Sequence, residues 1–394
     1  MSGKNLLEKL LDGADVEWVA LGDVAKYSNI RIDSTGIDEN NYVGVDNLLQ
    51  NRAGKINSSY VPTEGRLIEY RPGDILIGNI RPYLKKIWLA NQSGGTNGDV
   101  LVVRPTHESL SSGYLYQVLT DENFFAYNMQ HAKGAKMPRG DKAKILEYKF
   151  PIPCPNNPKK SLEIQAEIVR ILDSFTELTA ELTAELTARK KQYNYYRDKL
   201  LSFEEGEVEW KALGEVATIT IGEFVHKDKQ DVNAKYPVYN GGRTATGYYD
   251  KYNNTGNKII VSARGANAGF VNRLSSPYWA GNSCYSIGVV NEDSLNWNFV
   301  YYYLKQSEAK LIGIQQKGGI PAVSKKQMEE FLLPIPQLSE QERIVAILDK
   351  FDALTNSITE GLPREIELRQ KQYEYYRDLL LSFPKPETAL AASA

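Results

Sequence analysis

The sequence predicts an α+β fold with two mixed, mostly β globular domains, related by an approximate two-fold axis and separated by long antiparallel coiled-coil helices. The first observation is that a whole module occurs twice in the 394 residues, at an offset of 176 to 192 residues. A repeat of that length is far too long for a solenoid or a propeller. The other two observations are a helical spacing of apolar residues in the repeated segments and short β-branched runs between them.

Four motifs recur in the same order in both halves of the chain. The pairs are Val16-Glu17-Trp18 with Val208-Glu209-Trp210, Phe150-Pro151-Ile152-Pro153 with Leu333-Pro334-Ile335-Pro336, Ile171-Leu172-Asp173 with Ile347-Leu348-Asp349, and Tyr195-Tyr196-Arg197-Asp198 with Tyr375-Tyr376-Arg377-Asp378. Because the two tryptophans recur with this frame, we expect both to pack in a core. The frame predicts an N-terminal helical segment at 1–15, globular domains at 16–150 and 208–333, helical spacers at 151–207 and 334–384, and a flexible tail at 385–394.

The repeated spacers have the pattern of long helices. Apolar side chains from Ile164 to Leu200 fall at spacings of three and four, which places them on one stripe, and the second copy repeats this from Ile344 to Leu380. Gly361-Leu362-Pro363 interrupts the second stripe, and proline fits only the first turn of a helix. We therefore expect a break there, and we expect the two striped segments to pair antiparallel.

The segments between the spacers have a different character. They are rich in Gly, Asn and Tyr, and they carry short runs typical of β-strands at 74–77, 100–103 and 258–261. Asn-Gly and Asn-Asn pairs between these runs indicate turns. Short helices are expected near 114–119 and 297–304.

The charge of the chain differs between its parts. The net charge is -2, but residues 18–150 hold 16 Lys and Arg against 14 acids, residues 210–332 hold 14 against 10, and the remainder carries -8. Residues 133–149 alone hold six basic residues against two acids. Positive globular domains on acidic repeated segments indicate a polyanionic partner, although ordinary scatter of surface charge could give the same split.

Several classes of protein lack support in the sequence. There is no run of 18 apolar residues and no secretion signal, and Cys154 and Cys284 lie in different modules, so we expect a cytoplasmic chain with free thiols and no membrane partner. The scattered histidines give no metal-binding pattern. We find no P-loop and no convincing cofactor loop, and therefore predict no catalytic and no metal-ligating residue.

One segment carries a specific resemblance. Two tandem Thr-Ala-Glu-Leu tetrads begin at Thr179 and Thr183 and end at Leu182 and Leu186, and they precede the run from Arg189 to Asp198. Together with both Pro-Ile-Pro motifs, they resemble the specificity subunit of type I restriction-modification systems, and specifically its IC class. The resemblance covers residues 1 to about 384.

This resemblance implies a non-catalytic subunit of bacteria or archaea with two target-recognition domains, each reading one half of a bipartite, asymmetric DNA site. It implies three partners: double-stranded DNA, two modification (methyltransferase) subunits docked on the helices, and restriction (translocase and nuclease) subunits that join the complex. S-adenosylmethionine, ATP and magnesium would belong to those partners, and no cofactor is expected on this chain.

The resemblance also implies that the number of tetrads sets the unspecified gap in the site, two copies going with the shorter gap. Helix geometry independently supports such a spacer: four residues add about 6 Å and a net turn of about 40°. One base pair adds about 3.4 Å and turns about 34°. The rotations nearly match, so an added tetrad keeps a domain roughly facing its groove. The lengths do not match, so the spacer must be inclined to the DNA or the complex must flex. Alternatively the tetrad is only good helix sequence, although Thr does not favour helix.

DNA affinity requires Lys and Arg near phosphates, and specificity requires side chains that reach base edges. In the first domain the candidates are Asn79, Arg81, Tyr83, Lys85 and Lys86 after a strand, and Lys133, Lys136, Arg139 and Lys142 around a Gly/Pro loop. In the second domain they are Asn240, Arg243, Arg264, Asn267, Lys317, Lys325 and Lys326, several beside glycines. Each could instead be a solvated residue or part of a hairpin turn.

Two other functions remain open from the residues alone. One is a DNA methyltransferase with fused recognition domains, and the other is a coiled-coil scaffold. A reader of DNA would bind DNA only, the enzyme would also bind S-adenosylmethionine, and the scaffold would bind neither.

Overall fold

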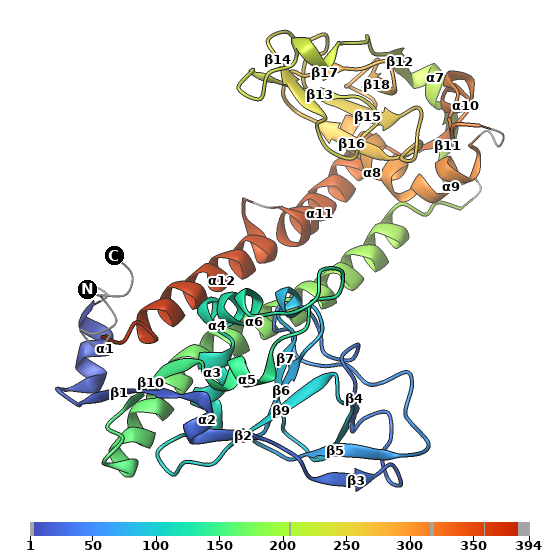
Figure 1. The fold of residues 1–394 in the computed structure, drawn as a ribbon. Helices are drawn as coiled ribbons and strands as arrows, with labels where there is room; N and C mark the ends of the chain where they lie inside the picture. Colours follow the sequence, from blue (N-terminus) through green and yellow to red (C-terminus); the bar gives the residue numbers. More distant parts are fainter. Residues whose placement is uncertain (1–3, 205, 316–318, 358, 385–394) are drawn as a thin grey trace. The chain divides into compact units, whose positions relative to one another are not determined.

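The computed structural model describes residues 4–204, 206–315, 319–357 and 359–384, and the chain forms two units (Figure 1). The first unit comprises residues 1–181 and 367–394, and the second comprises residues 182–366. Each unit contains one globular domain together with part of each repeated helical segment. Among the described residues, no helix has the length and apolarity needed to cross a membrane.

The first globular domain contains two four-stranded sheets and one two-stranded ladder. The first sheet has the order β2-β9-β6-β7, formed by Ala25–Tyr27, Val100–Pro105, Ile75–Gly78 and Ile87–Leu89. The second has the order β3-β5-β8-β4, formed by Arg31–Asp33, Arg66–Tyr70, Gly94–Thr96 and Tyr42–Val43. In the ladder, β1 (Val16–Ala20) pairs antiparallel with β10 (Lys149–Pro153). The helices are α1 (Lys4–Leu11), α2 (Leu21–Val24), η1 (Pro82–Leu84), α3 (Ser112–Leu119), α4 (Glu122–Gln130) and α5 (Lys142–Leu146).

The second globular domain repeats this plan. Its four-stranded sheet has the order β12-β18-β15-β16, formed by Ala217–Ile221, Cys284–Val289, Lys258–Ser262 and Val271–Leu274. A three-stranded sheet has the order β14-β13-β17, formed by Gly247–Tyr249, Tyr236–Tyr239 and Trp279–Ala280. β11 (Glu209–Ala212) pairs antiparallel with β19 (Leu332–Ile335). The helices are α7 (Leu213–Val216), η2 (Lys227–Lys229), α8 (Trp297–Gln306), α9 (Glu308–Gly313) and α10 (Lys325–Glu329).

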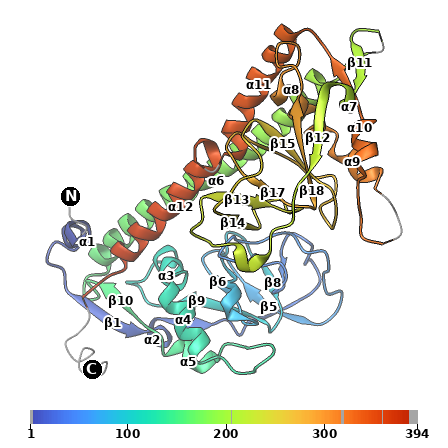
Figure 2. The same cartoon turned by 90° about the horizontal axis from the view of Figure 1, so that it is seen from above.

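The sheet β2-β9-β6-β7 of the first domain and the sheet β12-β18-β15-β16 of the second correspond strand by strand along the chain. Helix α3 packs on β7 and β9 in the first domain, and α8 packs on β15 and β16 in the second. Figure 2 shows α3 beside β9 and α8 beside β15. The strands predicted at 74–77, 100–103 and 258–261 and the helices predicted at 114–119 and 297–304 are therefore confirmed within a residue or two. The mixed, mostly β character of both domains is confirmed as well.

The repeated spacers are helical, as predicted. α6 (Pro158–Leu200) runs without interruption for 43 residues, whereas the second copy is divided into α11 (Leu338–Asn356) and α12 (Gly361–Leu380). The predicted break is confirmed, and Gly361 permits it: its φ is +74°, and a Cβ there would lie 2.3 Å from the carbonyl oxygen of Ala353.

Aromatic pairs connect α6 to these two helices within each unit. In the first unit Phe175 stacks on Tyr376 with ring centroids 5.2 Å apart. In the second unit Tyr193 and Tyr196 contact Phe351 at 6.2 and 5.8 Å. As the residue number increases along α6, from Phe175 to Tyr196, the number of the contacted residue decreases, from Tyr376 to Phe351. This is the order expected of antiparallel helices.

The two repeated tryptophans differ in burial. Trp18 packs against the core of the first unit, and its indole N–H donates to the carbonyl oxygen of Pro384 at 2.8 Å. Trp210 is 38% exposed and lies edge-on to Tyr303 at 6.3 Å. The expectation that both tryptophans pack in a core is therefore wrong for Trp210. The reason is that residues 381–384, which follow α12, lie against Trp18, whereas Trp210 lines a surface pocket with Tyr303 and Leu332.

Candidate nucleic-acid interface

In the first domain, the loop after β6 lies against the loop before α5. The backbone N–H of Arg81 donates to the carbonyl oxygen of Pro138 at 2.7 Å, and that of Gly140 donates to Asn79 at 3.1 Å. Ile80 and Arg139 form an isolated β-bridge between the two loops. The structure therefore brings together two groups of predicted DNA-contacting residues that are far apart in the sequence.

The second domain contains the same arrangement. The N–H of Gly265 donates to the carbonyl oxygen of Pro321 at 2.9 Å, and that of Val323 donates to Ala263 at 2.9 Å. Arg264 and Ala322 form the bridge. We call residues 79–81 with 138–140, and residues 263–265 with 321–323, the paired loops of the two domains.

The β-bridge in each paired loop contains one arginine, but the arginine belongs to the second segment of the loop in the first domain and to the first segment in the second domain. In the first domain it is Arg139, opposite Ile80, and in the second it is Arg264, opposite Ala322. Arg139 lies 3.0 Å from a carboxylate oxygen of Asp99, yet its side chain remains 56% exposed. Arg264 is also exposed. Each bridge thus contributes one exposed arginine.

A strained turn adds two more exposed side chains to the first domain. Arg81 and Lys85, at either end of η1, have φ of +52° and +51°, in the left-handed region that non-glycine residues rarely adopt. The N–H of Lys85 bonds to the carbonyl oxygen of Pro82 at 2.9 Å, and the Arg81 bond to Pro138 holds the other end. Arg81 is exposed and Tyr83 is 48% exposed, so both are accessible to a ligand.

Two of the predicted lysines in the first domain already have protein partners. Nζ of Lys85 donates to the carboxylate of Glu122 at 2.6 Å, and Nζ of Lys86 donates to the carbonyl oxygen of Val45 at 2.6 Å. Burial alone would raise the pKa of Glu122, but hydrogen bonds from Lys85 and Arg52 outweigh it, and the pKa is lowered. The charge of Lys85 is thus largely compensated within the domain.

The remaining lysines of the first domain are available. Lys133 pairs with Asp141 at 2.6 Å, yet its side chain is 80% exposed. Lys136 and Lys142 are exposed as well. These three residues flank residues 138–140 of the paired loop in the sequence.

Asn79 is a buried member of the paired loop. Its side chain is 6% exposed, and its amide oxygen has no hydrogen-bond partner among the described residues, as is also true of both amide atoms of Asn128. A Cβ on Gly140 would lie 2.5 Å from the Asn128 amide oxygen and 2.7 Å from that of Asn79. No pattern in the sequence pointed to Asn128, because its neighbours in space lie on distant segments.

In the second domain, two predicted asparagines shape their own loops. The side-chain oxygen of Asn240 accepts from the N–H of Ser283 at 3.0 Å. That of Asn267 accepts from Nε of Arg243 at 3.3 Å. Arg243 also lies over the ring of Phe270, 5.4 Å from its centroid, and it remains exposed.

The lysines of α10 are only weakly engaged. Lys325 lies 3.4 Å from Glu329 and Lys326 lies 3.7 Å from Glu330, one helical turn further on. Exposed pairs of this kind contribute little stability, so both lysines can turn to another anion. Lys317 lies outside the described residues.

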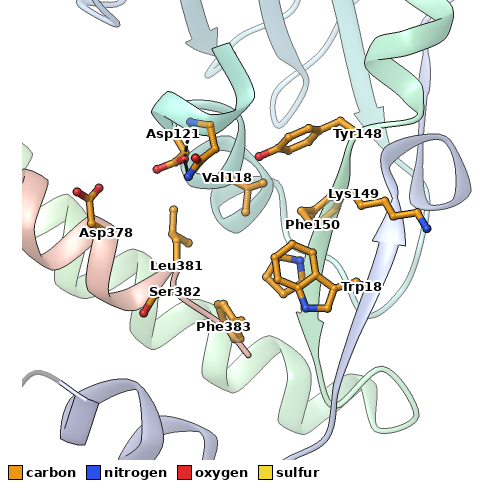
Figure 3. A pocket seen from close by; sticks show the side chains of 12 residues that line it. Trp18, Val118, Asp121, Tyr148, Lys149, Phe150, Asp378, Leu381, Ser382 and Phe383 are labelled. Atoms are coloured by element: carbon orange, nitrogen blue, oxygen red, sulfur yellow. Dashed lines mark hydrogen bonds between the residues drawn. The ribbon is translucent and has the colours of Figure 1, made fainter. Parts of the chain in front are cut away.

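A pocket of about 340 Å³ in the first unit has a different character (Figure 3). Trp18, Phe150, Leu381 and Phe383 line it, and Asp121 at its rim accepts hydrogen bonds from Asn123 at 2.8 and 2.6 Å. This pocket lies where residues 381–383 pack beside the β1–β10 ladder. Within the described part of the chain, no group of three or more His, Cys, Asp or Glu side chains could hold a metal ion.

Comparison with known proteins matches both halves of the chain to one family. The model of the type I restriction modification DNA specificity domain matches residues 14–189 and again 205–368. The chain is 38% identical over 412 residues to the EcoR124I/EcoR124II specificity subunit of Escherichia coli, covering 98% of this chain and 99% of that one. It is 40% identical over 224 residues to the EcoprrI specificity subunit of Escherichia coli, covering 54% and 55% of the two chains.

A solved structure has the same fold. The crystal structure of the S subunit of a type I restriction-modification system from M. genitalium matches with a TM-score of 0.63 over 95% of this chain and 98% of that chain, at 16% identity.

The two matched DNA specificity domains identify a recognition subunit rather than an enzyme. The chain belongs to the type I restriction modification DNA specificity family, and it is a specificity subunit. The resemblance stated from the sequence is confirmed at the level of this family, and the alternatives of a methyltransferase and of a scaffold are not favoured.

Proposed function

We propose that each globular domain reads one half of an asymmetric bipartite DNA site, that its paired loop makes the central contact, and that the helices set the gap. The observation that carries this proposal is that both domains present the same backbone arrangement with different side chains. The backbone N–H groups of Arg81 and Gly265 donate to equivalent proline carbonyl oxygens, so the two loops have the same backbone arrangement. Unlike residues at the bridge would then make the two half-sites different.

The chemistry of the exposed groups suits DNA. An arginine can bond in a bidentate manner to O6 and N7 of guanine in the major groove, which makes Arg139 and Arg264 candidates for reading bases. Arg81 belongs to the first paired loop, Lys133, Lys136 and Lys142 flank it in the sequence, and Arg243, Lys325 and Lys326 belong to the second domain. These residues would contact phosphates, which fix orientation without carrying sequence information.

The helices would dock the partner subunits. Tyr195 and Tyr375, at the same position of the repeat, are 62% and 57% exposed, and exposed aromatic side chains are typical of protein interfaces. We propose that two modification subunits bind there and that restriction subunits join this complex in the cytoplasm. S-adenosylmethionine, ATP and magnesium would be held by those partners. On the basis of the tandem tetrads we also propose that the chain belongs to the IC class.

We expect Arg264→Ala and Arg139→Ala each to relax the preference at one base pair of one half-site only, at a cost of about 1–3 kcal/mol in discrimination. The measurement is methylation of a randomised site library by the assembled complex at one salt concentration. Lys9→Ala on α1 removes the same charge away from the paired loops and should leave both half-sites unchanged. If a variant methylates every sequence of the library less efficiently by the same factor, the replaced arginine contacts phosphates instead of bases.

A further inference from the structure

A buried glutamine connects α6 to the first recognition domain. Gln165 has no exposed surface. Its side-chain oxygen accepts from the backbone N–H of Ser111, the N-cap of α3, at 2.8 Å. Its side-chain nitrogen donates to the carbonyl oxygen of Ser109 at 2.6 Å and to the hydroxyl of Ser161 at 3.0 Å. Every hydrogen bond of this amide is thus made either to residues at the start of α3 or to its own helix, α6.

The second unit repeats this contact with its own residues. Gln341 of α11 is also without exposed surface. It accepts from the N–H of Asn296, the N-cap of α8, at 2.8 Å. It donates to the carbonyl oxygens of Ser294 at 3.1 Å and Pro336 at 2.7 Å. The two glutamines occupy the same position of the helical repeat, and Ser111 and Asn296 occupy the same position of the two domain helices.

Each unit has a second polar anchor further along the same two helices. In the first unit Gln117 of α3 donates to Asp173 of α6 at 2.8 Å. In the second, Tyr302 of α8 donates to Asp349 of α11 at 2.5 Å, and Arg273 lies 3.0 Å from the same carboxylate. The anchors on α6 are eight residues apart, about 12 Å along the helix axis.

We propose that Gln165 and Gln341 are positioning residues that fix the angle between each recognition domain and its spacer helix, and thereby the accuracy with which the complex measures the gap. Two anchors separated along a helix define an angle, which one anchor cannot do. The apolar contacts between them, at Ile168 and Leu172, contribute stability but have little directional preference. Hydrogen bonds are directional, so they can select one angle. This inference rests on the proposed function of the chain.

The test compares gap selectivity in Gln165→Met and Gln341→Met with that of the natural chain. Methionine has a similar length but cannot form these hydrogen bonds. Each chain is assembled with its modification subunits, and methylation is measured on DNA carrying both half-sites with the preferred gap, one base pair fewer and one base pair more. We expect the ratio of preferred to altered gaps to fall about tenfold in each variant, which is roughly the net contribution of one of the three buried hydrogen bonds that each glutamine makes. Both half-sites should stay the same.

Two further variants make the result specific. Gln165→Glu keeps the acceptor for Ser111 but loses the donor to Ser109 and Ser161 and brings a carboxylate against the Ser109 carbonyl oxygen, so its ratio should fall at least as far as that of Gln165→Met. Gln192→Met, on the same helix, removes only an acceptor for Arg189 and should leave the ratio unchanged. If Gln165→Met does not accumulate as folded protein, Gln341→Met and Gln165→Glu give the same test.

If methylation by a variant falls by the same factor at all three gaps, the ratio of preferred to altered gaps is unchanged. This result would overturn the inference, because the glutamine would then act only on stability. A natural chain without any preferred gap would instead overturn the proposed function itself.

Discussion

Insertion of one Thr-Ala-Glu-Leu unit after Leu186 is expected to lengthen the preferred gap by one base pair and to leave both half-sites unchanged. The inserted turn rotates the C-terminal part of α6 by about 40°, close to the roughly 34° of one base pair, so the recognition surface keeps facing its groove. The measurement is methylome sequencing of a host that carries the lengthened chain and its modification subunits. An unaltered gap would contradict the role of the tetrads.

The packing of α6 explains why such an insertion should be tolerated. Of the described residues on this helix, none between Leu172 and Tyr193 is buried. The threonines bond back to their own helix, as Thr187 does to the carbonyl oxygen of Thr183 at 2.9 Å. We therefore expect the free energy of unfolding to change by no more than about 0.5 kcal/mol.

An insertion of three residues, Thr-Ala-Glu, is the matched control for the tetrad. It adds nearly the same length but rotates the C-terminal part of the helix by about 300°, a net change of about 60° in the opposite sense. We expect this chain to methylate poorly at every gap. Normal methylation with the three-residue insertion would show that rotation is not what the tetrad preserves.

Replacement of Arg377 by Met is expected to destabilise the first unit by about 3 kcal/mol, because it leaves a buried carboxylate without its counter-charge. The side chains of Arg377 and Asp121 are 4% and 8% exposed, and Nε lies 3.4 Å from the carboxylate. Arg377 also pairs with Asp378 at 2.7 Å. The free energy of unfolding in urea, monitored with a probe in the first unit, measures the loss.

The repeat supplies the control for this substitution. Arg197 is the equivalent residue of α6, but its side chain is 22% exposed and it pairs with the exposed Asp198. Replacement of Arg197 by Met should therefore cost less than about 1 kcal/mol. Equal losses in the two variants would show that the contact between Arg377 and Asp121 is not what stabilises the first unit.

The frame of the molecule could be predicted because its signals are local or repeated. The apolar stripes from Ile164 to Leu200 and from Ile344 to Leu380 need only a helical period to be recognised. Gly361 and Pro363 mark the break between α11 and α12. The duplicated motifs then revealed two domains without any knowledge of their tertiary contacts.

The candidate interface was less accessible from the sequence. Basic residues near Arg81 and Arg139 were recognised as two separate groups, because nothing in the sequence shows that a β-bridge joins the two loops. The ion pair between Glu122 and Lys85 and the burial of Asn79 also result from contacts between distant parts of the sequence. Gln165 did leave a signal: it is a polar residue on an apolar stripe, and Gln341 repeats it.

The modular reading of DNA is tested most directly by exchanging residues 21–148 for those of another member of the family. Strands β1 and β10, which close the first domain with Trp18 opposite Pro151, stay in place. Single-molecule methylome mapping of hosts that carry the natural or the exchanged chain, each with its modification subunits, should show one interrupted motif in both. We expect one half of this motif to change while the other half and the gap are retained. A change in both halves, or an uninterrupted motif, would contradict modular reading.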